Sequence, residues 1–301
     1  MCALAMATFG TLGLFVKNIN LQSGEIALWR AVLAILLIGA FLLISREKIS
    51  FSEIGREVPL LFISGAAMGF NWILLFEAYN YTTVSVATLA YYFAPVIVTL
   101  ACPIFFGEKM TAKGWICFFA STAGIVLITG VGDLSGSDKH LIGVLLGLAA
   151  AVLYASVVLL NKSIKRTRGL TRTFIQFIAA VLVLFPYVGL TGGFHLGELT
   201  GIAWGSLLSV GLIHTGVAYC LYFSSLKELS GQEASIISYI DPLVAVIISV
   251  SALSEKITAL QVVGGLLILG FTLYNELGGS HKKASEGCDN ESGAPEEKTE
   301  E

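Results

Sequence analysis

The sequence contains one segment twice, 147 residues apart. Residues 91–111 read YYFAPVIVTLACPIFFGEKMT, and residues 238–258 read SYIDPLVAVIISVSALSEKIT. A constant shift, without a gap, aligns a tyrosine, a proline and a Glu-Lys-x-Thr ending of the two segments. An internal repeat at that distance in a chain of 301 residues indicates two copies of one structural unit.

The composition indicates that this unit is embedded in a membrane. The chain is 55% hydrophobic and 13% charged, with a mean hydropathy of +0.82, whereas soluble domains carry about 25% charged residues. Long apolar runs in lipid must be helical, because no water is present to satisfy the backbone. We expect ten spans, at residues 3–16, 26–44, 59–76, 84–106, 113–129, 141–160, 173–190, 202–225, 234–253 and 260–274.

Basic residues give an independent test of this count. With ten spans and both termini in the cytoplasm, three lysines lie in outer loops (Lys17, Lys139 and Lys256) and fourteen basic residues lie in cytoplasmic segments. That bias favours this topology in a cell membrane. The fourteen are Arg46, Lys48, Arg56, Lys109, Lys113, Lys162, Lys165, Arg166, Arg168, Arg172, Lys227, Lys282, Lys283 and Lys298.

The count of five spans per copy fixes the relation between the copies. Because five is odd, the second copy enters the membrane from the opposite side, as in the inverted repeats of secondary transporters. The sequence therefore predicts an all-α integral membrane fold of ten transmembrane helices in two inverted five-helix repeats. We expect the first repeat at residues 1–130, the second at 141–277, and a disordered, acidic cytoplasmic tail at 278–301.

Each repeated segment has a proline in the middle of a span, beside a polar helical face. Such a proline breaks a helix, and a break or a polar face is tolerated in lipid only beside a cavity or other protein. We expect two kinked helices that line a central pathway; the alternative is a structural kink with hydroxyls bonded to their own helix. The residues concerned are Thr88, Tyr91, Tyr92 and Pro95 in the first copy and Ser235, Ser238, Tyr239 and Pro242 in the second.

Asp241 is the most informative single residue. It precedes Pro242 inside an apolar span, where a carboxylate costs roughly 3 kcal/mol on insertion scales. It could exchange a proton or hold the amine of a solute; the alternative is a structural acid paired with a neighbouring hydroxyl or with Arg30. Ala94 occupies the equivalent position in the first copy, so such a site would be asymmetric.

Other polar residues within spans are weaker candidates. His214 could relay protons or be a satisfied packing residue, and Asn71 could bind a solute or join two helices. Arg30 could face a cavity or extend its charged end to the interface. Tyr154 and Tyr222 would suit an amphipathic organic solute rather than a bare ion. At the span ends, Glu108, Lys109, Glu255 and Lys256 are expected to cap helices or bridge to the next helix, closing each half on its own side.

The repeated proline spans with their GEKMT and SEKIT endings, and the Leu28-Trp29-Arg30-Ala31 run, resemble the drug/metabolite transporter superfamily and most closely its EamA-type members. The resemblance covers about residues 1–277. It implies alternating access through a central cavity and export of small metabolites such as amino acids.

Together with the inverted repeat, the resemblance implies a secondary-active exporter of a small organic metabolite, with the lipid bilayer and protons as further partners. The alternatives are a carrier like those for sugar phosphates and nucleotide sugars, a facilitative channel, and more distantly a membrane sensor or scaffold. No Gly-x-x-x-x-Gly-Lys-Ser/Thr loop for an ATP-driven pump occurs in the sequence. We expect no catalytic residues, metal, cofactor or nucleic-acid partner, since the sequence has neither a catalytic or metal-ligand cluster nor a basic stripe.

Overall fold

A computed structural model describes residues 1–45, 51–107, 110–129, 138–167, 169–226, 228–229 and 231–291, with the backbone alone for 51–53, 231–232, 235 and 278–291. Within this part of the chain, all regular elements are helical. Those of the first half are α1 (Cys2–Gly10), α2 (Leu12–Val16), α3 (Ser23–Ile44), α4 (Phe51–Tyr81), α5 (Val84–Tyr91), α6 (Ala94–Phe106) and α7 (Ala112–Thr129). Those of the second half are α8 (Asp138–Ser163), α9 (Gly169–Thr191), η1 (Leu196–Glu198), α10 (Gly201–Leu208), η2 (Ser209–Val217), α11 (Ala218–Ser225), α12 (Gly231–Ser238), α13 (Ile240–Ser251) and α14 (Ala259–Glu291).

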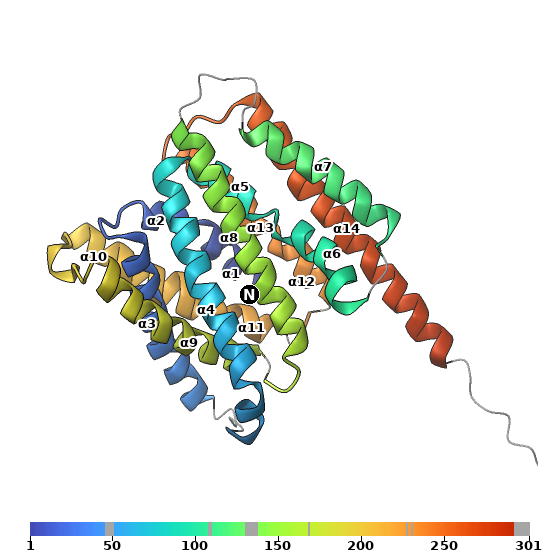
Figure 1. The fold of residues 1–301 in the computed structure, drawn as a ribbon, viewed down its shortest axis with the longest axis horizontal. Coiled ribbons are helices and arrows are strands. Elements are labelled where there is room, and N and C mark those ends of the chain that lie inside the picture. The colour runs from blue at the N-terminus through green and yellow to red at the C-terminus, as the bar shows by residue number, and fades with distance from the viewer. Residues whose placement is uncertain are drawn as a thin grey trace, which may run out of the picture.

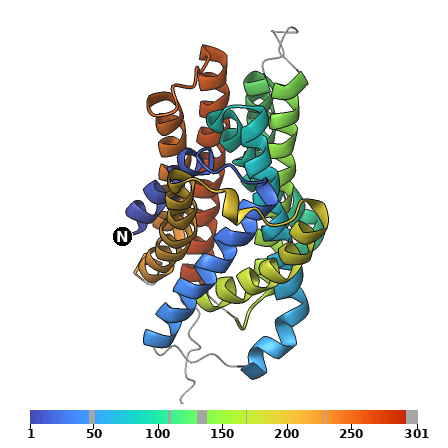
Figure 2. The same ribbon diagram turned by 90° about the vertical axis from the view of Figure 1, so that its left-hand side faces the viewer.

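These elements confirm the predicted membrane fold. Eight of the described helical stretches are long and apolar enough to cross a membrane, and two shorter apolar ones, Cys2–Val16 and Ile236–Ser251, coincide with the first and ninth expected spans. Helices α7 and α14 lie side by side along one edge of the molecule, and α3, α4 and α9 pack together on the other (Figure 1). Figure 2 shows the same bundle from the side.

Large apolar side chains lie on the outside of the bundle as well as in its core. Leu43, Ile44 and Leu190 are each more than four-fifths exposed, whereas Phe76 and Phe177 are buried between α4 and α9. Such exposure would be a liability in water. It is the arrangement expected where lipid is the solvent.

Both repeated proline spans are divided into two helices. In the first, α5 ends at Tyr91 and α6 begins at Ala94, with Pro95 in the first turn of the new helix. In the second, α12 ends at Ser238 and α13 begins at Ile240. Proline is favoured in the first turn, where its missing N–H removes no helical hydrogen bond. We call the two divisions the first hinge (residues 91–95) and the second hinge (residues 238–242).

The eighth span contains a π-helical segment, η2, that its apolar pattern does not predict. The Oγ1 of Thr215 donates to the carbonyl of Val210, five residues earlier (2.7 Å), and His214 Nδ1 lies 3.0 Å from the carbonyl oxygen of Ser209. These two side chains bond to carbonyls at the i−5 spacing of a π-helix, and such segments often mark functional sites.

Helix α14 continues to Glu291, beyond the start of the tail for which the composition predicts disorder at residues 278–301. Extending an existing helix avoids the cost of nucleation, and no proline intervenes before Pro295. Residues 292–301 lie outside the described part of the chain.

Candidate functional site

A cavity of about 490 Å³ lies between the two halves and is lined by both. Its size is in the range of small-molecule sites. The expected residues that line it are Thr88, Tyr91, Tyr92 and Pro95 at the first hinge, Ser238, Tyr239 and Asp241 at the second, and Tyr154, Tyr222 and Arg30 on other helices. A second cavity of about 280 Å³ adjoins it and shares Pro95, Tyr154 and Glu276.

The two hinges are joined directly by one hydrogen bond. The Tyr92 hydroxyl donates to Oδ2 of Asp241 over 2.6 Å, and the two residues come from opposite repeats. Of the two partners considered for Asp241, a hydroxyl and Arg30, the structure shows the hydroxyl. Arg30 makes no ion pair with Asp241.

Arg30 is buried at the cavity wall and does not reach the interface. Its side chain is 4% exposed, its Nε donates to Oγ1 of Thr215 over 2.7 Å, and its guanidinium carbon lies 4.5 Å from the centroid of the Trp72 ring. The π-helical segment fixes the Thr215 hydroxyl, because that hydroxyl also donates to Val210. The position of the guanidinium is therefore set by three elements, α3, α4 and η2.

His214 and Asn71 are not among the residues that line the cavity. His214 is 3% exposed and is hydrogen-bonded to Thr11 (2.9 Å) as well as to the Ser209 carbonyl. Asn71 donates to the carbonyl of Ala150 on α8 over 2.6 Å. Both side chains make the helix-joining contacts of the packing alternative, and their roles in transport stay predictions. Each polar side chain is already satisfied by a neighbouring helix.

Three further expected residues show no polar group that is both described and free of a local hydrogen bond. Pro242 is buried and is not among the lining residues, and the side chain of Ser235 is not described. Ser238 lines the cavity, but its hydroxyl donates to the carbonyl of Ala234 over 2.8 Å, which is the local bond considered as the alternative for these hydroxyls.

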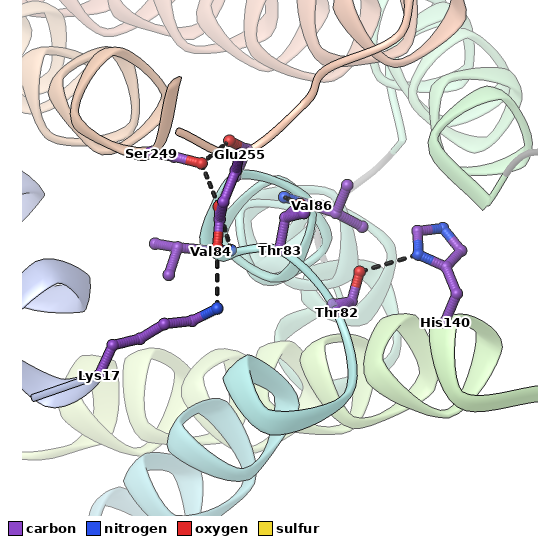
Figure 3. Close-up of polar contacts among 9 residues, drawn as sticks. Lys17, Thr82, Thr83, Val84, Val86, His140, Ser249 and Glu255 are labelled. Atoms are coloured by element: carbon purple, nitrogen blue, oxygen red, sulfur yellow. Dashed lines mark hydrogen bonds and ion pairs between the residues drawn. The ribbon is translucent and has the colours of Figure 1, made fainter. Parts of the chain in front are cut away.

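One end of the cavity is bounded by a polar cluster around Glu255, shown in Figure 3. Oε1 of Glu255 accepts from Lys17 Nζ (2.8 Å), and Oε2 accepts from the backbone N–H of Val84 (2.9 Å). The Ser249 hydroxyl donates to Glu255 and accepts from Ser85. We call Lys17, Val84, Ser85, Ser249 and Glu255 the Glu255 cluster.

The Glu255 cluster identifies the contact that Glu255 makes at its span end. Glu255 does cap a helix, but that helix is α5 of the opposite half rather than the next helix, α14. A carboxylate stabilises the N-terminal end of a helix, where backbone N–H groups lack partners. Lys256 is exposed, and Glu108 and Lys109 lie outside the described residues.

The opposite end of the cavity contains polar residues that the sequence analysis did not select. Gln176 Nε2 donates to Oγ of Ser64 (2.6 Å) and to Oδ1 of Asn161 (2.7 Å), and Arg172 Nη1 donates to the Asn161 carbonyl (3.3 Å). Arg172, Thr173 and Gln176 share one face of α9, at the spacing of three and four residues that the sequence itself displays. The search for polar residues inside apolar spans could have found them.

Comparisons with known proteins agree with this architecture. The family model described as "EamA-like transporter family" matches residues 1–130 and again residues 141–275. A Bacillus subtilis protein named "Uncharacterized transporter YxxF" is 31% identical over 95% of this chain and 92% of its own length. An Archaeoglobus fulgidus protein named "Uncharacterized transporter" is 26% identical over 90% and 93%. A solved structure titled "Crystal structure of protein" shares the fold with a TM-score of 0.63, at 16% identity over 90% of this chain and 93% of that one.

Proposed function

Because the chain belongs to the EamA-like transporter family, we propose that this multi-pass integral membrane protein is a secondary-active exporter of a small organic metabolite, an amino acid or a similar solute. The observation that supports this best is the cavity of about 490 Å³ between the halves, with hinge residues in its wall and a polar cluster at one end. A site between two inverted repeats is where alternating-access transporters bind their solute.

The charge bias gives this proposal a direction. It assigns the Glu255 end to the outside and both termini to the cytoplasm, with the protein in the cell membrane. With that orientation, the structure corresponds to a state in which the Glu255 cluster keeps the outer end of the cavity closed. Alternating access requires that cluster to separate, so that α5 moves away from the loop that carries Glu255.

Proton coupling through Asp241 is part of the proposal. Its carboxylate lines the cavity and is hydrogen-bonded to Tyr92 of the other half. A proton or a solute amine that binds at Asp241 competes for the same carboxylate. Loading of the site is thereby linked to the contact between the hinges.

The test is flux in proteoliposomes. Purified protein is expected to move an amino acid or a similar metabolite, from a broad panel, without ATP. The matched preparation lacks residues 278–301 and should transport equally well, whereas a sensor or scaffold acting through its tail would lose its function. Ion currents without flux of any organic solute would instead indicate a channel. Flux confined to sugar phosphates or nucleotide sugars would indicate the alternative carrier class.

A further inference from the structure

We infer that Arg30 is the anion-binding residue of the cavity, and that its terminal nitrogens hold the carboxylate of the transported solute. This inference rests on the proposed transport function and narrows the class of solute. From the sequence, Arg30 could either face a cavity or extend its charged end to the membrane interface.

The charge of Arg30 has no counter-ion within the described part of the chain. No carboxylate among the described residues lies within ion-pair distance of its guanidinium, although the side chain is 4% exposed. The acids that line the cavity are Asp241, which accepts from Tyr92, and Glu276 of α14. An unpaired buried charge is costly, so a bound anion would gain from neutralising it.

The hydrogen-bonding groups of Arg30 are only partly used. Of the five N–H donors of an arginine, Nε donates to Thr215, and no acceptor among the described residues reaches Nη1 or Nη2. The ring faces of Trp72 and Phe76 lie 4.5 and 5.6 Å from the guanidinium carbon. Those contacts hold the group in place without using its donors.

The two terminal nitrogens of Arg30 match one kind of ligand group, a carboxylate. The two terminal nitrogens of a guanidinium form a planar fork that fits the two oxygens of a carboxylate. A lysine could not make the same two-nitrogen contact, because its ammonium group is a compact point charge. Thr215 and Trp72 fix the plane of the fork in advance, which lowers the entropy cost of binding.

Asp241 adds a second requirement. It lines the same cavity as Arg30 and lies within electrostatic range of it, yet the two do not pair. A solute with a carboxylate for Arg30 and an ammonium for Asp241 would neutralise both. Trp72, Tyr79, Tyr91 and Tyr219 supply aromatic walls for the apolar part of such a zwitterion.

The experiment uses four compounds built on one phenylethyl skeleton. L-phenylalanine has both charges, 3-phenylpropionate only the carboxylate, phenethylamine only the ammonium, and phenethyl phosphate a phosphate instead. Binding to the purified full-length protein is measured by calorimetry. In the wild type, the two carboxylates are expected to bind. In Arg30→Gln they should weaken by roughly tenfold to a hundredfold, the range for a charge-assisted pair, while phenethylamine is unaffected.

Two further variants separate binding from structure. Arg30→Lys keeps the charge without the fork and should restore carboxylate binding only in part. Arg56→Gln removes an exposed arginine on α4 and should change nothing. Thermal unfolding of each variant shows whether it is folded.

Each contrary result overturns the inference. Equal weakening of the amine and the carboxylates in Arg30→Gln would make Arg30 a structural link between α3 and η2. Preference for the phosphate, or failure of both carboxylates to bind the wild type, would exclude the carboxylate assignment. Flux of other solutes in proteoliposomes would then leave the transport proposal standing, whereas absence of all flux would defeat that proposal itself.

Discussion

The two hinges have the same backbone design and different chemistry. Each divides a span into two helices and places a tyrosine at the division, Tyr92 in the first hinge and Tyr239 in the second. The hydroxyl of Tyr92 donates to Asp241. The hydroxyl of Tyr239 is buried beside Thr272 and has no carboxylate partner among the described residues. Ala94 stands where the second copy has Asp241, so one acid gives the pair of hinges its asymmetry.

Residues at repeated positions also gather at the span ends. Lys17 pairs with Glu255 at one end of the cavity. Its counterpart at a shift of 145 residues, Lys162, lies 3.9 Å from Sγ of Cys102, and its Nζ lies 4.2 Å from the centroid of the Phe106 ring. Cys102 is the counterpart of Ser249, which shares the carboxylate of Glu255 with Lys17. The comparison teaches that duplication preserves the backbone of the hinges, while the single change from Ala94 to Asp241 gives one of them an acid.

The largest expected effect comes from removing the acid that distinguishes the hinges. In Asp241→Asn we expect flux to fall at least about tenfold, since charge-assisted hydrogen bonds contribute roughly 1.5–3 kcal/mol. An inwardly directed proton gradient should speed efflux by the wild type and leave the variant unaffected. The ionisable groups near Asp241 are Tyr79, Tyr91, Tyr92, Tyr154, Tyr219 and Arg30.

Proteoliposome flux at several pH values measures this effect, and Asp138→Asn, at an exposed acid of α8, is the control. An unchanged flux with an unchanged pH profile in Asp241→Asn would remove Asp241 from the mechanism. The hinges would then be alike in function as well as in backbone.

The second effect concerns the Glu255 cluster. Glu255→Gln keeps the shape of the side chain and removes its charge, which weakens both the cap on α5 and the pair with Lys17, by roughly 1–3 kcal/mol together. We expect the outer end to open more often. A cysteine at Val84, in a protein without its native cysteines, should then react several-fold faster with an impermeant maleimide added outside.

Glu198→Gln, at an exposed acid of η1, is the matched control for this measurement. Equal labelling rates in Glu255→Gln and the unaltered protein would show that the cluster does not hold the outer end closed.

Sequence reasoning could predict the fold more completely than the site. Hydrophobic runs and the 147-residue repeat depend on local composition, so the spans and the two hinge positions were accessible from the chain alone. The partners of Arg30, Asn71 and Glu255 were not, because each lies on a helix far away in sequence. Arg30 meets Thr215 across 185 positions, and Glu255 meets Val84 across 171. The π-helical segment is not predicted either, since its i−5 bonding pattern leaves no signature in the hydrophobic period.

A third prediction tests the hinge comparison at single-atom level. Tyr92→Phe leaves Oδ2 of Asp241 without its donor and should cost about 1–3 kcal/mol of unfolding free energy. Tyr239→Phe removes a buried hydroxyl whose neighbour is neutral Thr272, itself bonded to the Ile268 carbonyl, so it should cost less than Tyr92→Phe does. Thermal unfolding in detergent compares the two. Equal destabilisation would mean that the second hydroxyl is engaged as strongly as the first.

The smallest effect should come from Lys17, at the edge of the Glu255 cluster. Its side chain is 32% exposed, and exposed ion pairs contribute about 0–1 kcal/mol. Lys17→Met should therefore speed outside labelling of the cysteine at Val84 less than Glu255→Gln does, and high salt should reproduce the change in the unaltered protein. Lys162→Met alters the counterpart at the other end and serves as the control, with no expected effect on that rate. If Lys17→Met opened the outer end as much as Glu255→Gln, the lysine charge rather than the cap on α5 would keep it closed, because the cap remains intact in that variant.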